Sequence, residues 1–410
     1  MRTIDPGGGA RLVLEPQDLE TRGPEYAAIA KGSIAPWRLG PATAMALEDS
    51  IQREGWPAGA VCESEKTMAE HFGVGVRLMR QAFRILQARG AGRPQRGRNG
   101  GLVVLRPDLD AAAAALSDNL RWSGVTPEEV REAREVLAPS QAGGAIDPGR
   151  ALALAGFERF LATVAGPSEA LRMQLQLPET IRANRASHMA WIIGQGITHE
   201  RCRNGDRLGS LWDLTEKHGV SLAVAIDAIR ILEDAGVVVC VKGRSGGVNL
   251  RLPQSEAVIA LMHGYLAAAG AAEEQCVVVC HQLNIRAARK VAESRSPELI
   301  ALVEDIHRRM ACAQGDSVMT TWYALQKTLH DHAGNRALHL ITRCLAAYTV
   351  RSGAIDAQPL GPRFLDNMVQ ATGVMVAAIR AGDAAGAEQG QCLTRRVLDE
   401  RSPAPRAAAA

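Results

Sequence analysis

Seven arginines and no acidic residue lie between Val74 and Arg98. Within this stretch Arg77, Arg80 and Arg84 recur at three- and four-residue spacing, which places them on one face of a helix. A guanidinium group can bind a phosphate oxygen or the edge of a guanine through paired hydrogen bonds. The stretch therefore indicates a surface for a phosphate-rich partner, and the alternative for any isolated run of charge is a solvated basic face.

The composition of the whole chain does not indicate a nucleic-acid partner by itself, because the net charge is only +3 over 410 residues. Apolar residues make up 47%, which is enough for the buried cores of two or three domains. Aromatic residues make up only 4%, which favours close-packed helices. No stretch reaches the roughly 20 uninterrupted apolar residues of a membrane helix, so we expect a cytoplasmic protein without a membrane partner.

The chain repeats itself at an offset of 146 residues. The second copy is not acid-free, because residues 220–244 carry three bases and three acids. So many matches at one offset indicate a tandem duplication. The matched positions include Ser64 with Ser210, Glu70 with Glu216, Gly73 with Gly219, Arg84 with Arg230, and Gly101 with Gly247.

Each copy has the pattern of three helices followed by a two-stranded hairpin. In the first copy Ser64 predicts an N-cap and Gly73 a left-handed C-cap, with a further helix before them. Apolar residues at helical spacing predict the third helix from Val76 to Arg89. Turn-forming residues from Pro94 to Gly101 precede the apolar stretch Leu102 to Leu105, which predicts a hairpin.

Both copies resemble the winged helix-turn-helix signature of the GntR family. The first does so through SEKTMAEHFGVGVRLMRQAFRILQARG and GRNGG, the second through DRLGSLWDLTEKHGVSLAVAIDAIRILEDAGVV and GRSGG. Residues 125–139, 325–335 and 377–389 resemble the FadR-type branch of that family, which has an all-helical FCD effector domain. Residues 157–167 resemble the same element as 325–335, so the first effector-type domain is shortened.

The resemblance implies a mainly α fold with two winged helix-turn-helix units, each of three helices plus a β-hairpin wing, and all-helical effector-type domains. We expect two GntR units fused in tandem. The expected parts are an N-terminal extension at 1–35, the first winged unit at 36–107, a shortened FCD-like segment at 108–184, a degenerate second winged unit at 185–253, an FCD-like effector or oligomerisation domain at 254–400, and a disordered tail at 401–410.

In the family the third helix lies in the major groove and the wing enters the minor groove, so the resemblance implies double-stranded DNA as the partner. The first copy keeps Arg80, has Lys66 where an arginine is usual, and has Arg77 beside Val76 at the main recognition position. Arginines on the wing suit a narrow minor groove. The expected DNA-binding residues are Lys66, Arg77, Arg80, Arg84, Arg96, Arg98, Asn99, Lys242 and Arg244.

The second copy has Leu222 and Ile226 at the recognition positions, and these side chains can pack but contact bases poorly. Its wing still offers Lys242 and Arg244 for phosphate contact, or the unit is kept only as a pseudo-dimer partner. Family resemblance implies homodimers on palindromic sites, whereas a fused pair could satisfy the pseudo-twofold within one chain. Both arrangements stay open.

Many effector domains of this branch hold a metal through one aspartate and three histidines, but the matching positions here offer no good ligand. We therefore expect no metal and no cofactor. An organic-acid effector would then need other positive groups. The matching positions are Trp322, Gln326, Thr372 and Thr394, and the candidate effector-binding residues are Arg286, Arg289 and Arg343.

Two other groups were weighed as metal ligands. His332 and His339 are seven residues apart, close to His330, and could share a helix face, although surface or capping histidines are commoner than ligands. Cys276 and Cys280 lie one helical turn apart and are more simply a core pair.

The function expected from these features is sequence-specific transcription regulation, responsive to a ligand through the C-terminal helical domain. The motifs GxSxG, HExxH and GxxxxGK[ST] are absent, so we do not expect an enzyme. The alternative is a helical adaptor or association protein that does not bind DNA. Salt-dependent binding to a duplex would separate the two.

Overall fold

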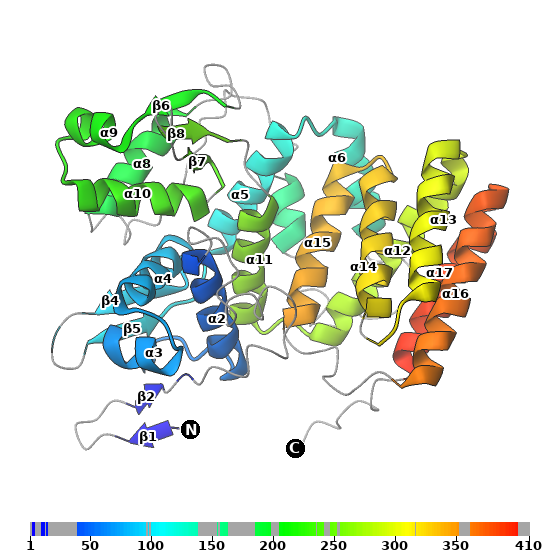
Figure 1. The fold of residues 1–410 in the computed structure, drawn as a ribbon, viewed down its shortest axis with the longest axis horizontal. Helices are drawn as coiled ribbons and strands as arrows, with labels where there is room; N and C mark the ends of the chain where they lie inside the picture. Colours follow the sequence, from blue (N-terminus) through cyan, green and yellow to red (C-terminus); the bar gives the residue numbers. More distant parts are fainter. Residues whose placement is uncertain are drawn as a thin grey trace. The chain divides into compact units, whose positions relative to one another are not determined.

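The computed structural model is mainly helical in the part of the chain that it describes, as the composition predicts (Figure 1). It divides into two compact units. Unit 1 comprises Met1–Gly124 and Ile146–Ala272, and unit 2 comprises Val125–Ala145 and Glu273–Ala410. The described residues are 2–4, 10–12, 14, 39–95, 97, 100–137, 154, 156–162, 185–197, 205–234, 236–241, 247–251, 255–315, 317–351 and 361–400.

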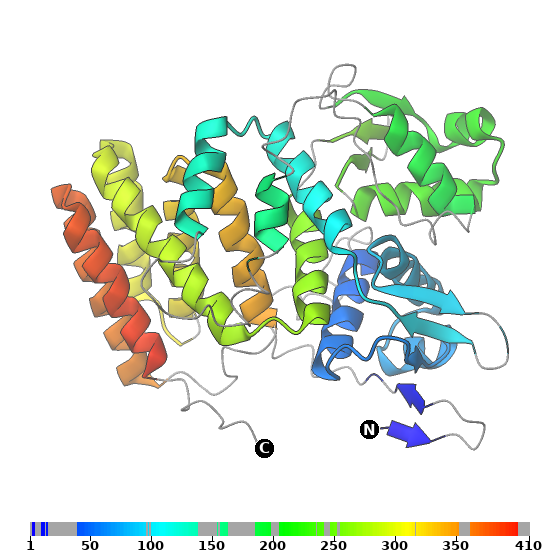
Figure 2. The same ribbon diagram turned by 180° about the vertical axis from the view of Figure 1, so that it is seen from behind.

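The first copy in unit 1 starts with a helix and ends with an antiparallel hairpin, drawn in blue to cyan in Figure 2. The hydroxyl of Ser64 accepts a hydrogen bond from the Thr67 amide at 3.2 Å and caps the second helix, which Gly73 follows at φ 61°. Only glycine adopts that left-handed conformation without strain. The elements are α2 (Leu39–Arg53), β3 (Val61–Cys62), α3 (Glu65–His71), α4 (Val76–Ala88), β4 (Gly92–Gln95) and β5 (Gly101–Val104).

Two further strands precede these elements. The strand β1 (Arg2–Ile4) pairs antiparallel with β2 (Ala10–Leu12), and β2 pairs parallel with β3. The resulting sheet has the order β1-β2-β3-β5-β4. Part of the expected N-terminal extension therefore adds to the sheet of the first copy.

The second copy repeats the order of the first, with each element starting 146 residues later than its counterpart. Ser210 and Asp213 form a capping box, and Gly219 at φ 60° ends that helix, so the caps recur as well. The three strands have the order β6-β8-β7. The elements are α8 (Arg185–Gly196), β6 (Arg207–Gly209), α9 (Leu211–His218), α10 (Leu222–Asp234), β7 (Val238–Val241) and β8 (Gly247–Leu250).

Equivalent helices of the two copies contact each other within unit 1. The helix α4 packs against α10, whose bounds correspond to those of α4 at the offset of 146. The helix α5 (Leu109–Trp122) packs against its own counterpart, α11 (Ser255–Ala269). Unit 1 thus contains two contacts in which an element meets its own repeat.

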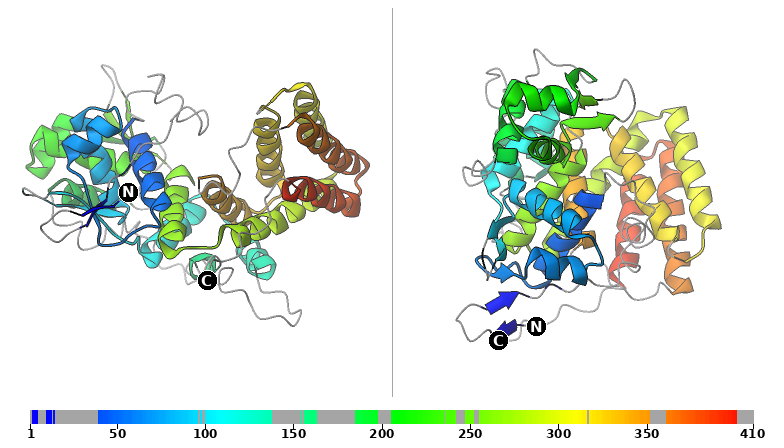
Figure 3. Two further views of the ribbon diagram at one scale, coloured as in Figure 1. Left: turned by 90° about the horizontal axis from the view of Figure 1, so that it is seen from below. Right: turned by 60° about the vertical axis from the view of Figure 1, so that its left-hand side comes forward.

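Unit 2 is a bundle of helices whose α12 to α17, yellow-green to red, lie together in both panels of Figure 3. Gly390 lets α17 pack closely against α16, because an added Cβ would lie 2.4 Å from the Met375 Cα atom. No described helix is long and apolar enough to cross a membrane. The elements are α6 (Pro127–Leu137), α12 (Glu273–Ser294), α13 (Pro297–Cys312), α14 (Ser317–His332), α15 (Arg336–Arg351), α16 (Pro362–Ala381) and α17 (Ala384–Asp399).

This division differs from the boundaries expected from the sequence. The helix α6 was expected in the shortened segment at 108–184, but it belongs to unit 2, where it packs against α15. The helix α11 was expected in the domain at 254–400, but it belongs to unit 1. The physical reason is that each helix buries its apolar face against elements that are distant in the chain.

Candidate functional site

Three of the predicted DNA-binding side chains are exposed around the junction of α3 and α4. Lys66 lies in the first turn of α3, and Arg77 and Arg80 lie one turn apart on α4. Arg80 donates from Nε to the Glu65 carboxylate at 2.9 Å, which brings its helix face next to Lys66. The Arg80 side chain remains 53% exposed, so this surface presents cations to solvent.

Arg84 lies on α4 but differs from Arg77 and Arg80, with which it was expected to act. Its guanidinium forms an ion pair with Asp227 on α10, and the side chain is half-buried. Arg84 lies one turn beyond Arg80, in the half of the helix that α10 covers. The predicted arginine stripe is therefore divided between an exposed part and a contact between the copies.

The predicted wing residues of both copies lie outside the described residues. Arg93 on β4 is described and exposed, so the first hairpin presents at least one cation. The wing residues outside the described part are Arg96, Arg98, Asn99, Lys242 and Arg244.

A buried group of charges joins the two copies, and the sequence analysis did not identify it. Arg89 donates from Nε and Nη2 to the two carboxylate oxygens of Asp234 at 3.0 and 2.7 Å, and from Nη1 to Glu48 at 2.9 Å. The three side chains are at most 8% exposed. Although burial lowers the pKa of Arg89, the two carboxylates outweigh it and raise the pKa, so the guanidinium stays charged.

The repeat itself carries a signal for this group. At the offset of 146, Asp234 matches Ala88 and Arg89 matches Ala235, so each copy supplies one charge of the bidentate pair where the other has alanine. Each copy thus has a charged residue where the other has alanine, and the two charges are opposite. This pattern could have indicated a contact between the copies.

The second copy presents a neutral surface at the equivalent positions. Trp212 occupies the position of Lys66 and is 69% exposed, and the exposed Ala223 occupies that of Arg77. Leu222 and Ile226 are half-buried on α10. The described surface of α9 and α10 therefore lacks the three cations that the first copy presents there.

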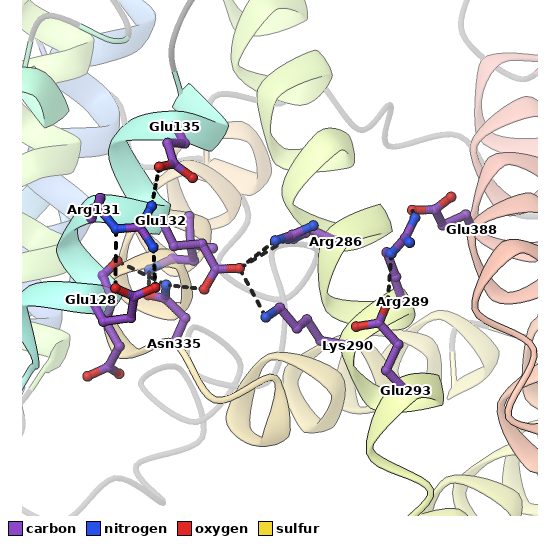
Figure 4. A network of polar contacts seen from close by, with 12 residues as sticks. Glu128, Arg131, Glu132, Glu135, Arg286, Arg289, Lys290, Glu293, Asn335 and Glu388 are labelled. Atoms are coloured by element: carbon purple, nitrogen blue, oxygen red, sulfur yellow. Dashed lines mark hydrogen bonds and ion pairs between the residues drawn. The ribbon is translucent and has the colours of Figure 1, made fainter.

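Arg286, which was predicted to bind an effector, pairs with a carboxylate instead. Arg286 donates to Glu132 of α6 through Nε at 3.1 Å and Nη2 at 2.8 Å, and Lys290 lies 3.3 Å from the same carboxylate (Figure 4). Asn335 also donates to Glu132, at 3.0 Å. Although burial raises the pKa of Glu132, these partners outweigh it and lower the pKa. The network attaches α6 to α12 and α15.

The other two arginines predicted to bind an effector are also on unit 2. Arg289 donates to Glu293 at 2.8 Å and to Glu388 of α17 at 3.1 Å (Figure 4). Arg343 is half-buried on α15. An anion that approached Arg286 or Arg289 would have to compete with the carboxylate already paired with it. This cost makes them weaker candidates for an anion site than the sequence suggested.

The four positions that the family resemblance assigns to a metal lie in the bundle interior on α14, α16 and α17. Trp322, Gln326, Thr372 and Thr394 are all buried. Their indole, amide and hydroxyl groups are not the carboxylate or imidazole donors that divalent cations need. These residues do not fit a metal. Among the described residues, no three His, Cys, Asp or Glu side chains gather into a potential metal site either.

The histidines and cysteines weighed from the sequence do not form a metal site among the described residues. His330 is buried and lies 2.8 Å from Asn284 Oδ1, and burial lowers its pKa to about 3. His332 ends α14 whereas His339 lies on α15, so the two do not share the helix face that was considered for them as an alternative to surface or capping roles. Cys276 is buried on α12 and Cys280 is partly buried there, and burial raises the pKa of both thiols to about 12. These thiols stay protonated and unreactive at neutral pH.

Two solved structures superpose on about half of the chain. Streptococcus agalactiae GntR superposes with a TM-score of 0.37 at 14% identity, covering 52% of this chain and 99% of its own. Escherichia coli McbR/YncC superposes with 0.26 at 14% identity, covering 48% and 86%. TM-scores this low do not establish a shared architecture.

Two sequence comparisons complete these findings. No curated protein sequence matches the chain. Residues 276–395, which lie within unit 2, match the family model described as FCD domain. This match supports the predicted resemblance to GntR-type regulators that carry such a domain. The C-terminal bundle is thus similar to an FCD domain.

Proposed function

We propose that this protein is a transcription regulator of the GntR type that binds DNA through unit 1 and senses a ligand through unit 2. The observation that carries the DNA-binding part is the exposed set of Lys66, Arg77 and Arg80 around α3 and α4. The FCD match at residues 276–395 supports the sensing part. The protein acts by binding two partners, and we assign it no catalytic step.

We further propose that both copies in unit 1 are winged helix-turn-helix units arranged as a pseudo-dimer within one chain. The contacts of α4 with α10 and of α5 with α11 support this arrangement, since each helix meets its own repeat. An element near a twofold axis packs against its own counterpart in an isologous interface. One chain then supplies the arrangement that two identical chains supply in a homodimer.

The charges between the copies favour pairing within a chain over pairing of two first copies. Arg89 of the first copy meets Asp234 of the second, and the first copy has Ala88 at the position of Asp234. Two first copies placed together would leave each buried Arg89 without that carboxylate. Arg89 would keep only Glu48, and removing one partner from a buried ionic group costs about 3–5 kcal/mol, which disfavours the symmetric alternative.

The first test is DNA binding by the purified full-length chain, with its operator located by genome-wide footprinting. Arg77→Ala combined with Arg80→Ala should weaken operator binding by about 2–5 kcal/mol, at roughly 1–3 kcal/mol for each contact. The same double variant should lower the slope of affinity against salt concentration by about 2, because fewer counterions are released. Mass photometry should find one chain on each bound operator.

The matched control is Arg308→Ala combined with Arg309→Ala, two exposed arginines on α13 of unit 2. This control removes the same charge and should leave operator affinity unchanged. Equal losses in both double variants would mean that net charge alone drives binding. No salt-dependent binding to any duplex would favour the alternative of a helical adaptor, and two chains on each operator would contradict the pseudo-dimer.

A further inference from the structure

Three polar atoms on α14 and α16, in the interior of unit 2, have no hydrogen-bond partner among the described residues. They are Trp322 Nε1, Gln326 Oε1 and Thr372 Oγ1, on side chains that are at most 6% exposed. Leaving a buried donor or acceptor unsatisfied costs about 1–3 kcal/mol, so native structures rarely keep such groups without a bound molecule. Three of them in one bundle point to something that completes their hydrogen bonds.

The three atoms come from facing helices. Trp322 and Gln326 lie one turn apart on α14, and the amide of Gln326 donates to Gln391 Oε1 on α17 at 3.1 Å. Trp322 packs in the same apolar cluster as Met368 on α16, one turn before Thr372. The polar atoms therefore lie on two neighbouring helices, α14 and α16, beside the Gln326 contact with α17 and next to an apolar cluster.

The chemistry of this group is neutral. An indole N–H can only donate and an amide oxygen can only accept, whereas the threonine hydroxyl can do both. Arg286 and Arg289, two of the candidates for binding an anion, instead pair with Glu132 and Glu388. A carboxylate placed among these three neutral side chains would lose its hydration without gaining a charge partner from them, which is unfavourable.

We propose that unit 2 binds a small uncharged molecule, such as an amide or a lactone with a hydroxyl group, between Trp322, Gln326 and Thr372. The molecule accepts a hydrogen bond from the Trp322 indole and donates one to the Gln326 carbonyl oxygen. It takes the place where the family resemblance implies a metal, because the donor set here suits no cation. The proposal rests on the proposed function only in treating unit 2 as a sensor.

The test pairs uncharged probes with carboxylates of matching shape on the full-length protein without DNA. Propionamide is compared with propionate, and galactonolactone with galactonate. The Trp322 indole N–H resonance, assigned by its loss in Trp322→Phe, reports local binding, and the melting temperature reports overall stabilisation. The uncharged probes should shift both, and the carboxylates should shift neither.

The variant Thr372→Val keeps the side-chain shape and removes the hydroxyl. It should raise the melting temperature of the ligand-free protein, because an unsatisfied buried group is gone, and weaken probe binding about three- to tenfold. The matched control is Thr342→Val on α15, whose buried hydroxyl already donates to the Leu338 carbonyl at 2.8 Å. That control should lower the melting temperature and leave probe affinity unchanged.

Several outcomes would overturn the proposal. The Trp322 resonance could respond to the carboxylates and not to their uncharged partners, or to no probe at all, which would leave bound water as the partner of these atoms. Equal effects of Thr372→Val and Thr342→Val on probe binding would also contradict it. Because no DNA is present, a failure of DNA binding leaves this test unaffected.

Discussion

The two copies in unit 1 have the same order of elements, but one presents a cationic surface where the other presents a neutral one. The first presents Lys66 and Arg77 where the second presents Trp212 and Ala223. Both copies nevertheless keep the serine cap of the second helix and the glycine after it. Both copies therefore retain the residues that form and cap the helices. At the positions of Lys66 and Arg77, only the first has the cations that would bind phosphate.

The copies also contribute differently to the contact between them. The first supplies the cations Arg84 and Arg89, and the second supplies Asp227 and Asp234. Near the start of the third helix an arginine is exposed to solvent. Near its end an arginine instead forms an ion pair with the other copy. We infer that the second copy serves mainly to hold the first in a pseudo-dimer.

The largest expected effect comes from breaking the charge group between the copies. Arg89→Met should destabilise unit 1 by about 3–5 kcal/mol, because Glu48 and Asp234 would stay buried without their cation. Hydrogen exchange of peptides from α4 and α10 measures this loss. Arg131→Met on unit 2 is the control, since Arg131 forms exposed ion pairs that contribute little.

A second change in the same contact sharpens this result. Adding Asp234→Ala to Arg89→Met should cost less than the sum of the two single changes, since both act on one hydrogen-bonded pair. If Arg89→Met alone were to cost less than 1 kcal/mol, the contact between the copies would not be the stabilising element that we infer.

An intermediate effect is expected from giving the second copy the cations of the first. Trp212→Lys combined with Ala223→Arg should tighten operator binding by about 1–3 kcal/mol and steepen its salt dependence, because two phosphate contacts become possible. Titration of labelled operator at several salt concentrations measures both quantities. An unchanged affinity would mean that this surface of the second copy does not face the duplex. The difference in DNA binding between the copies would then not be due to surface charge alone.

The smallest effect concerns α6 and its repeat in α12. Glu132 on α6 corresponds to Val278 at the offset of 146, so only the first copy provides this carboxylate. Its partners lower its pKa below the ordinary value of 4.5, so the stabilisation is present above that pH and is lost as the pH falls below it. Unit 2 should therefore lose stability in acid.

The measurement is the melting temperature of the full chain at several values between about pH 3 and pH 7, the range in which carboxylates titrate. Glu132→Gln should lower the melting temperature at neutral pH and flatten its dependence on pH. Glu54→Gln is the control, because that glutamate is exposed and lies on unit 1. A pH profile unchanged by Glu132→Gln would exclude this carboxylate as the source.

Local features of unit 1 could be predicted from the sequence. Ser64 caps α3, Gly73 adopts the left-handed conformation, and α4 begins at Val76 as the apolar spacing indicates. These features follow from hydrogen bonds and side-chain spacing within one or two helical turns, so neighbouring residues determine them. The same reasoning placed α6 and α11 in the wrong parts of the fold, because their packing partners are far away in the chain.

The sequence by itself determined the helices, their caps and the offset of 146 at which they recur, since these depend on contacts between near neighbours. Tertiary structure decided which charged side chains remain exposed. Arg77 and Arg84 lie on one predicted stripe, yet only Arg84 meets a carboxylate of the other copy. Likewise, Thr372 is an ordinary helical residue until the packing of the bundle buries its hydroxyl without a partner. Burial depends on segments that are far apart in the chain, and local sequence patterns do not contain that information.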